Sequence, residues 1–151
     1  MLRIGLISDT HDLLRPEVLD FLRGSDHILH GGDICGGAVL QALAALAPLT
    51  AVRGNNDRGD WARALREREV VELAGARILV VHDIADLKRA PDTSGAGTVV
   101  YGHSHQPMVE QRGGVLYVNP GSAGPRRFKL PIAAGELLVD QGRVSARIVH
   151  F

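Results

Sequence analysis

The chain has 151 residues, of which 45% are hydrophobic and 23% are charged. These values are typical of a globular domain with its own core and exclude an intrinsically disordered chain, so we expect one domain over residues 1–151. Lysine plus arginine and aspartate plus glutamate both number 17, and this balance excludes a global basic field that would attract nucleic acid or an anionic membrane.

The first half of the chain alternates predicted strands with predicted helices. Leu2–Ile7 is expected to form a buried strand, and Pro16–Leu22 a helix with its proline in the first turn. His27–His30 is expected to be a second strand, residues 38–46 a helix, and residues 50–53 a third strand. This order predicts a parallel sheet with covered faces, because crossover connections between parallel strands are right-handed.

The second half is dominated by short predicted strands. After a short helix at residues 61–66, we expect strands at residues 70–73, 77–81, 98–101, 108–111, 115–118, 137–139 and 144–149. Glycines at positions 75, 113, 114 and 142 mark tight turns, so much of this half is expected to form antiparallel hairpins. The expected architecture is two packed sheets with helices outside them.

No apolar run approaches the roughly 20 residues that cross a bilayer. The first predicted strand begins directly after Met1, without a basic and apolar leader. The single cysteine, Cys35, excludes an internal disulfide framework and fits a reducing compartment. We therefore expect a cytoplasmic protein with no membrane partner.

Side chains that can bind metal follow five of the predicted strands. In chain order they are Asp9 and His11, then Asp33, then Asn55 with Asp57, then His82, and finally His103 and His105. Because strand carboxyl ends open onto a shared crevice in such sheets, we expect these side chains to converge. An Asp-x-His or His-x-His pair in extended backbone places both residues on one side, so the pair can bind one ion or straddle two.

This ligand set combines oxygen and nitrogen atoms and needs no thiolate. It suits manganese, iron, cobalt, nickel or zinc, and the share of histidine disfavours magnesium or calcium alone. We expect two divalent ions, with manganese first and nickel, zinc, iron or cobalt as alternatives. Asp33, central in the ligand order, is the natural bridge between ions about 3.5–4 Å apart, and a water held between them is acidic enough to be hydroxide near neutral pH.

The motifs D-T-H, G-G-D-I, G-N-N-D, V-H-D, G-H-S-H and N-P-G-S occur in this order along nearly the whole chain. With them the sequence resembles the calcineurin-like metallophosphoesterases, in particular their small single-domain phosphodiesterase branch. The resemblance implies an α/β fold, a four-layer αββα sandwich of two mixed sheets flanked by helices. It also implies that the N-P-G-S turn at residues 119–122 is structural and lies near the site.

The same resemblance implies which residues bind metal and act in catalysis. One ion would be held by Asp9, His11, Asp33 and His105, and the other by Asp33, Asn55, His82 and His103. We expect Asn55, Asp33 and His82 to be the catalytic residues, with a bridging hydroxide attacking phosphorus in line.

Three residues depart from the family pattern. Asn56 stands where the larger phosphatases carry a histidine, and an amide cannot act as a general acid, so we expect a preference for diesters or good leaving groups. Asp83 stands where the family usually has glycine, and Ile84 cannot supply a further imidazole. Both can change the approach of substrate or the affinity for the second ion.

Other polar residues receive structural interpretations. His27 and His150 are expected to be ordinary structural histidines, and His30 is expected to be structural or, alternatively, to orient a ligand. Asp57 is expected to cap a loop or support a ligand. Cys35 is expected to be a small buried hydrophobic residue, with a thiol near the site as the alternative.

Three cationic residues follow the N-P-G-S turn, namely Arg126, Arg127 and Lys129. They can contact a phosphate or form a solvated loop, and the sequence leaves both interpretations open.

We expect a metal-dependent phosphodiesterase that acts on a small phosphate ester. A phosphomonoesterase with the same dinuclear chemistry is one alternative. A non-catalytic scaffold or binding module is another, because the retromer scaffold subunit has this fold and fold alone does not establish activity. A nuclease is a weaker alternative, since the balanced charge indicates no extensive nucleic-acid surface. The sequence leaves the oligomeric state open, a homo-oligomer included.

Overall fold

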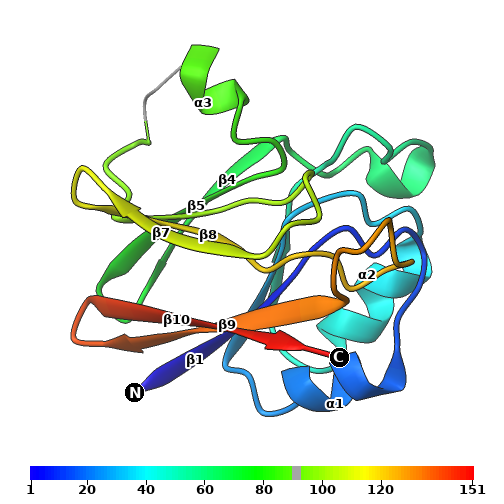
Figure 1. The fold of residues 1–151 in the computed structure, drawn as a ribbon, viewed down its shortest axis with the longest axis horizontal. Coiled ribbons are helices and arrows are strands. Elements are labelled where there is room, and N and C mark those ends of the chain that lie inside the picture. Colours follow the sequence, from blue (N-terminus) through cyan, green and yellow to red (C-terminus); the bar gives the residue numbers. More distant parts are fainter. Residues whose placement is uncertain (90–92) are drawn as a thin grey trace.

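The structure is a computed structural model that describes residues 1–89 and 93–151. Its strands form two five-stranded sheets (Figure 1). The first sheet has the order β10-β9-β1-β2-β3, with β1 (Leu2–Ile7), β2 (His27–His30), β3 (Leu49–Ala51), β9 (Ala133–Asp140) and β10 (Arg143–His150). The second has the order β4-β5-β6-β8-β7, with β4 (Arg68–Leu73), β5 (Ala76–Val81), β6 (Thr98–Val100), β7 (Met108–Arg112) and β8 (Val115–Asn119).

The main core lies between the two sheets. Alternation along β1 directs Ile4 and Leu6 into this layer, where they join Ile78 and Val80 of β5 in one fully buried cluster. Burying a side chain of this size contributes about 1.5–3 kcal/mol. This shared core fixes the two sheets face to face and therefore fixes the loops at their edges.

Helices cover the outer face of the first sheet. Helices α1 (Pro16–Leu22) and α2 (Gly37–Ala44) bury Leu22 and Leu43 against Ile7 and Ile28. On the opposite side of the molecule, the short helix α3 (Asp86–Arg89) packs Leu87 against the outer face of the second sheet (Figure 1). The expected four-layer sandwich of two mixed sheets is confirmed, with a thin second helical layer.

The strand pairing agrees with the sequence in the first sheet and differs in part in the second. Strands β1, β2 and β3 are parallel, and β9 and β10 form the expected hairpin. Strands β4 and β5, like β7 and β8, are antiparallel hairpins. However, β5, β6 and β8 pair in parallel, because the intervening segments cross over instead of turning back.

Two predicted elements differ most from the structure in their bounds. The helix expected at residues 61–66 is one 3-10 turn, η1 (Asp60–Ala62), because Arg66 instead pairs with Val52 beside β3. Strand β9 begins at Ala133, before the predicted residue 137. Its first residues are alanine and glycine, which are weak strand formers, but pairing with β10 holds them in the sheet.

Within residues 1–89 and 93–151, no helix has the length and apolar character needed to cross a membrane.

A nearly buried carboxylate ties α1 to the first sheet. Glu136 of β9 accepts hydrogen bonds from Arg3 Nε at 2.5 Å and Arg147 Nε at 2.9 Å, and its side chain is 7% exposed. Arg3 in turn donates to the Phe21 carbonyl in α1 at 2.6 Å. Burial alone would raise the pKa of Glu136, but the two guanidinium groups outweigh burial and hold the pKa below its usual value.

We expect Glu136→Gln to lower the free energy of unfolding by about 1–3 kcal/mol at pH 7, because it leaves two cations without their partner. A lowered folded-state pKa stabilises the protein above the unfolded value of about 4.3, and this contribution disappears as the pH falls through the folded-state pKa. Urea unfolding of the wild-type protein and of Glu136→Gln should show that the difference between their free energies of unfolding is smaller in acid than at pH 7. Glu72→Gln is the control because its partner Arg77 is exposed, and an equal loss in both variants would contradict the prediction.

Candidate metal centre

The loops that follow β1, β2, β5 and β6 meet at one edge of the two sheets. The Asp9 amide donates to the Gly32 carbonyl at 3.0 Å, and the Gly102 amide donates to the His82 carbonyl at 2.9 Å. The first of these hydrogen bonds joins the loop after β1 to the loop after β2, and the second joins the loop after β6 to the loop after β5. Both lie next to predicted metal ligands.

One group of potential ligands consists of Asp9, His11 and His105, whose ligand atoms lie within 4.8 Å of one another. His105 Nε2 is 3.4 Å from Asp9 Oδ1. Asp9 is fully buried and His105 is 5% exposed, so these atoms face the protein interior. The D-T-H and G-H-S-H motifs therefore meet although they are far apart in the sequence.

A second group consists of Asp9, Asp33 and His82. His82 Nε2 lies 3.5 Å from Asp33 Oδ2 and 3.1 Å from Asn55 Oδ1. The exposed residue His103 directs Nδ1 to within 3.3 Å of the same His82 nitrogen. All seven predicted metal ligands therefore lie in this one cluster.

Two carboxylates connect the groups. Asp33 Oδ2 is 3.7 Å from His11 Nε2 as well as 3.5 Å from His82 Nε2. This central position agrees with the bridging role expected of Asp33. Asp9 also belongs to both groups, whereas the resemblance assigned it to one ion only.

The donor atoms fit divalent cations. Among the described side chains, Asp9 Oδ1, His11 Nε2 and His105 Nδ1 are buried without a hydrogen-bond partner. Leaving a buried polar atom unsatisfied costs about 1–3 kcal/mol, so such atoms usually have a partner. Carboxylate oxygens and imidazole nitrogens together are the donor set of transition metals, and ions bound here would satisfy Asp9 Oδ1 and His11 Nε2.

The electrostatics of the cluster also favour positive charge. Burial lowers the pKa of His82, but the carboxylates of Asp33 and Asp9 outweigh burial and raise this pKa to about 9. Burial raises the pKa of Asp33, yet hydrogen bonds from His82 and Asn56 hold it well below its usual range. Asp33 is therefore a carboxylate at neutral pH, as a bridging ligand must be.

Hydrogen bonds around the cluster orient its histidines. His82 Nδ1 lies 2.7 Å from the Gly31 carbonyl, to which it can only donate, so Nε2 is the ring nitrogen that faces the cluster. His30 is fully buried, and burial lowers its pKa to about 3. Its ring contacts Thr10 Oγ1 and accepts from the Gly32 amide, both beside metal-centre loops. His30 is thus a neutral residue that fixes these loops, as the structural interpretation expects.

The backbone is strained where the ligands lie. Five predicted ligands have positive φ, namely Asp9 at 53°, His11 at 44°, Asp33 at 55°, His103 at 72° and His105 at 62°. A non-glycine residue in this region costs on the order of 1–3 kcal/mol and persists only where its surroundings impose it. This strain was not expected from the residue types of the ligands.

Asp57 supports the cluster without entering it. Its carboxylate accepts from the Gly54 amide and the Cys35 amide, both at 2.8 Å, as the capping interpretation expects. Cys35 is half-buried and directs Sγ to within 3.5 Å of His11 Nδ1, which corresponds to the alternative of a thiol near the site. Burial and the Asp57 carboxylate raise the pKa of Cys35 to about 11, so it stays a thiol.

The N-P-G-S turn holds two ligand loops together. Ser122 Oγ donates to the Asp9 carbonyl at 3.0 Å, and Asn119 Nδ2 donates to the Gly102 carbonyl at 3.1 Å. Asn119 Oδ1 also accepts from the Gly121 amide and closes the turn. The turn has the expected structural place beside the site.

The cationic loop after this turn is exposed to solvent. Arg126, Arg127 and Lys129 are all exposed. Burial is the main cause that lowers the pKa of His11, and the positive charge of Arg127 acts in the same direction. No contact in the described structure assigns a role to Arg126 or Lys129.

The departures from the family pattern have distinct positions. Asn56 donates from its backbone and side-chain nitrogens to the two oxygens of Asp33, each at 2.9 Å. It therefore orients the central carboxylate, a role that its sequence position did not indicate. Ile84 packs with the outer core of the second sheet. Asp83 Oδ2 lies 3.7 Å from His103 Nε2, on the side of the ring away from His82.

This arrangement predicts that Asp83 supports His103 as a ligand. A carboxylate behind a ligating histidine orients the ring and makes it more basic, and its loss typically costs 10–100-fold in metal affinity. Because both side chains are partly exposed, we expect Asp83→Gly to weaken the second metal by about tenfold. Asp83→Asn, which keeps an oxygen, should weaken it less. Calorimetric titration of metal-stripped protein measures both, and equal affinity in all three proteins would exclude this role.

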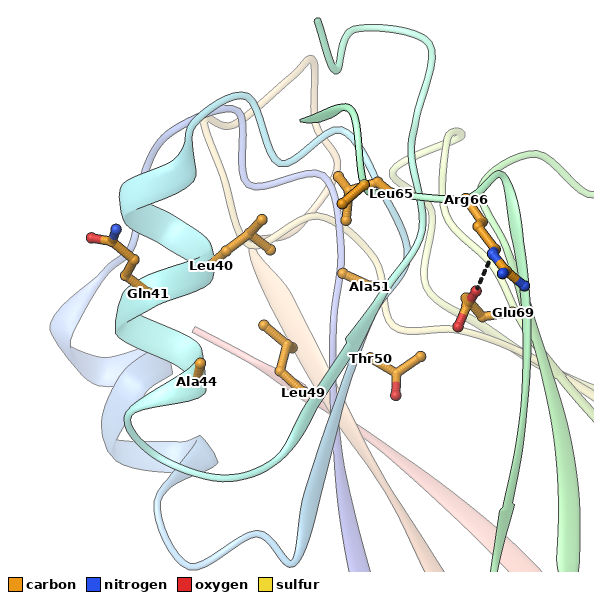
Figure 2. A pocket seen from close by; sticks show the side chains of 10 residues that line it. Leu40, Gln41, Ala44, Leu49, Thr50, Ala51, Leu65, Arg66 and Glu69 are labelled. Carbon is orange, nitrogen blue, oxygen red and sulfur yellow. Dashed lines mark ion pairs between the residues drawn. The ribbon is translucent and has the colours of Figure 1, made fainter. Parts of the chain in front are cut away.

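Two cavities of the described structure differ in their position relative to the metal centre. A groove of about 500 Å³ lies between α2 and β3, and Figure 2 shows Leu40, Leu49 and Leu65 on its walls. None of the predicted metal ligands lines this groove. A smaller pocket of about 350 Å³ is lined by Asn55, His82 and His103, so it is the one that adjoins the metal centre.

Comparisons with known proteins agree with this geometry. Residues 2–142 match the calcineurin-like phosphoesterase superfamily domain. A probable metallophosphoesterase of Methanothermobacter thermautotrophicus is 33% identical, over 97% of this chain and 91% of the relative. A phosphodiesterase of Methanocaldococcus jannaschii is 27% identical, over 80% of this chain and 83% of the length of the relative. The structure of Vps29 from Entamoeba histolytica in complex with zinc is similar to this one, with a TM-score of 0.76 and 23% sequence identity. The match covers 99% of this chain and 99% of the Vps29 chain.

Proposed function

This chain belongs to the calcineurin-like phosphoesterase superfamily, and we propose from that premise that it is a metal-dependent phosphodiesterase. The observation that carries the proposal is the pair of ligand groups that share Asp9, are connected through Asp33 and leave buried donor atoms without partners. The likeness to a protein named a phosphodiesterase supports the preference for diesters. We further propose that the substrate is a small phosphate ester and that manganese is the native metal.

The ligand assignments follow from the two groups. Asp9, His11 and His105 would hold one cation, and His82, Asn55 and His103 the other, with Asp33 between them. Divalent ions bound in this way polarise phosphoryl oxygens and make water a stronger nucleophile. In the protein itself, Asn56 holds the Asp33 carboxylate and the Gly31 carbonyl fixes the His82 ring. The strained loops keep these groups in place before substrate arrives.

The proposed preference for diesters rests on two residues. Asn56 uses its amide to bind Asp33 and has no titratable proton for a leaving alcohol, so good leaving groups are favoured. Asp83 adds negative charge beside His103 at the mouth of the site. A dianionic monoester is repelled by such a carboxylate more than a monoanionic diester is.

The test is a substrate panel with metal-stripped protein supplied in turn with manganese, nickel, zinc or magnesium. We expect bis(4-nitrophenyl) phosphate to be hydrolysed with a higher kcat/KM than 4-nitrophenyl phosphate, and manganese to give the highest rate. Faster hydrolysis of the monoester would instead support a phosphomonoesterase with the same metal chemistry.

A non-catalytic binding module is the second candidate, because Vps29 shares this fold and a fold can carry several functions. Such a module would remain inactive toward both esters with every metal. The full set of predicted ligands, gathered in one cluster, favours the enzyme.

A further inference from the structure

A buried serine contacts one of the predicted metal ligands. Ser8 directly follows β1 and is fully buried. Its hydroxyl donates to Asp9 Oδ2 at 2.7 Å. Neighbouring side chains point to opposite sides of an extended strand, and these two meet because Asp9 leaves the strand with a φ of 53°. The strained backbone of Asp9 therefore brings its carboxylate to the serine.

The two oxygens of the Asp9 carboxylate have different surroundings. Besides the Ser8 hydroxyl, Oδ2 accepts from the His103 amide at 3.1 Å. Oδ1 is buried and has no hydrogen-bond partner in the described structure. It lies 3.4 Å from His105 Nε2 and 4.0 Å from His82 Nε2, which belong to different ligand groups. Hydrogen bonds thus occupy Oδ2 and leave Oδ1 as the oxygen that faces the histidines.

Two glycines make room for the Ser8 hydroxyl. A Cβ at Gly102, in the loop after β6, would overlap Ser8 Oγ. A Cβ at Gly31, in the loop after β2, would lie 2.6 Å from the same oxygen. Both loops therefore enclose the hydroxyl beside Asp9, and a side chain in either loop would compete with it for this space.

We propose that Ser8 is a positioning residue of the metal centre, whose hydroxyl holds Asp9 Oδ2 so that Asp9 binds metal through Oδ1 alone. This inference rests on the proposed function, because it requires the metal centre. A carboxylate with two free oxygens can rotate and bind one ion through both atoms. The hydrogen bond from Ser8 opposes this rotation and fixes the direction of Oδ1, as donors to ligating carboxylates do in other metal sites.

Ser8→Ala removes the hydroxyl and leaves the His103 amide as a donor to Oδ2. We expect its affinity for manganese to fall by about tenfold, as when a hydrogen-bond partner of a metal ligand is lost. Calorimetric titration of metal-stripped protein measures this affinity. Ser25→Ala is the matched control, because Ser25 is also buried and its hydroxyl donates to the Leu22 carbonyl at 2.7 Å, beyond the end of α1. We expect the control to lose stability without losing affinity for manganese.

The visible spectrum of the cobalt-loaded protein distinguishes positioning of Asp9 from a merely structural role of Ser8. When a carboxylate adds its second oxygen to an ion, the coordination number rises, and the d–d absorption of Co(II) weakens as its coordination number rises. At saturating cobalt we expect Ser8→Ala to absorb more weakly per bound ion than the wild type, and Ser25→Ala to match the wild type. An unchanged spectrum of Ser8→Ala would overturn the inference, whatever its affinity.

Gly31→Ala tests the same contact while Ser8 is retained. Gly31 does not have a positive φ, so its backbone tolerates alanine. The new methyl group would press on the Ser8 hydroxyl, and we expect the affinity for manganese to fall. In the Ser8→Ala background the methyl group would instead meet Ser8 Cβ at 3.1 Å, so the same substitution should have a smaller effect. An equal fall in both backgrounds would contradict the proposed role of the hydroxyl.

These results are separable from the test of the proposed function. Metal binding without hydrolysis of any ester would overturn the proposed function, and the cobalt spectrum would still decide the role of Ser8. A wild-type protein that binds neither manganese nor cobalt would overturn both.

Discussion

Replacing Asp33 by Asn is expected to lower kcat/KM for bis(4-nitrophenyl) phosphate by at least about a thousandfold. Metal ions supply several kcal/mol of transition-state stabilisation, and each 1.36 kcal/mol is worth a factor of ten in rate. Asp33 Oδ2 lies within 3.7 Å of both His11 and His82, so its loss affects both ligand groups. Asn56 donates to both oxygens of Asp33, and an asparagine would turn one of its own donors toward Asn56.

The bound metal of Asp33→Asn should fall from two ions per chain to one or none, measured by elemental analysis after dialysis. Circular dichroism should show that the variant is folded. Asp20→Asn is the matched control, because Asp20 is exposed on α1 and pairs only with Arg23 in the described structure. Full activity and two bound ions in Asp33→Asn would show that Asp33 is not a bridging ligand.

Gly102→Ala is expected to have the second largest effect, a loss of stability and of bound metal. The cause is steric overlap, because the substitution changes no charge. A Cβ at this position would overlap Ser8 Oγ and lie 2.6 Å from Asp9 Oδ2. Ser8 and Asp9 are fully buried, so neither can move aside freely. Overpacking of this kind costs about 1–3 kcal/mol of stability. Displacement of Asp9 should also remove metal, because Asp9 belongs to both ligand groups.

Thermal unfolding and metal content measure these two effects together. Gly97→Ala is the control, because a Cβ at Gly97 would meet no atom within 4 Å. We expect the control to unfold at nearly the wild-type temperature and to retain both ions. Equal stability and metal content in Gly102→Ala would mean that the loops at this edge can relax without disturbing the ligands.

The convergence of the candidate ligands could be predicted from the sequence because their motifs lie directly after buried strands. Asp9 follows β1 and His82 follows β5, and the order of strands limits where such residues can meet. Short strands can be recognised in a sequence by their apolar residues and by the glycines that follow them. The fold class follows from the same features.

Other features of the site depend on contacts between distant segments and could not be predicted from local pattern. From the sequence, Asn56 was notable only because it replaces a histidine of the larger phosphatases. In the structure its side-chain amide donates a hydrogen bond to Asp33. The sequence favoured a core position for Cys35 with a thiol near the site as the alternative, and the sulfur contacts His11. The parallel pairing of β5 with β6 was missed because neighbouring turns suggested hairpins.

Convergence of the two ligand groups on a pair of cations is tested most directly by anomalous diffraction from crystals of the protein grown with manganese. We expect two peaks about 3.5–4 Å apart. One should lie among Asp9, His11 and His105, and the other beside Asp33 and His82. A single peak in the cluster, or manganese bound only elsewhere on the surface, would contradict a dinuclear centre.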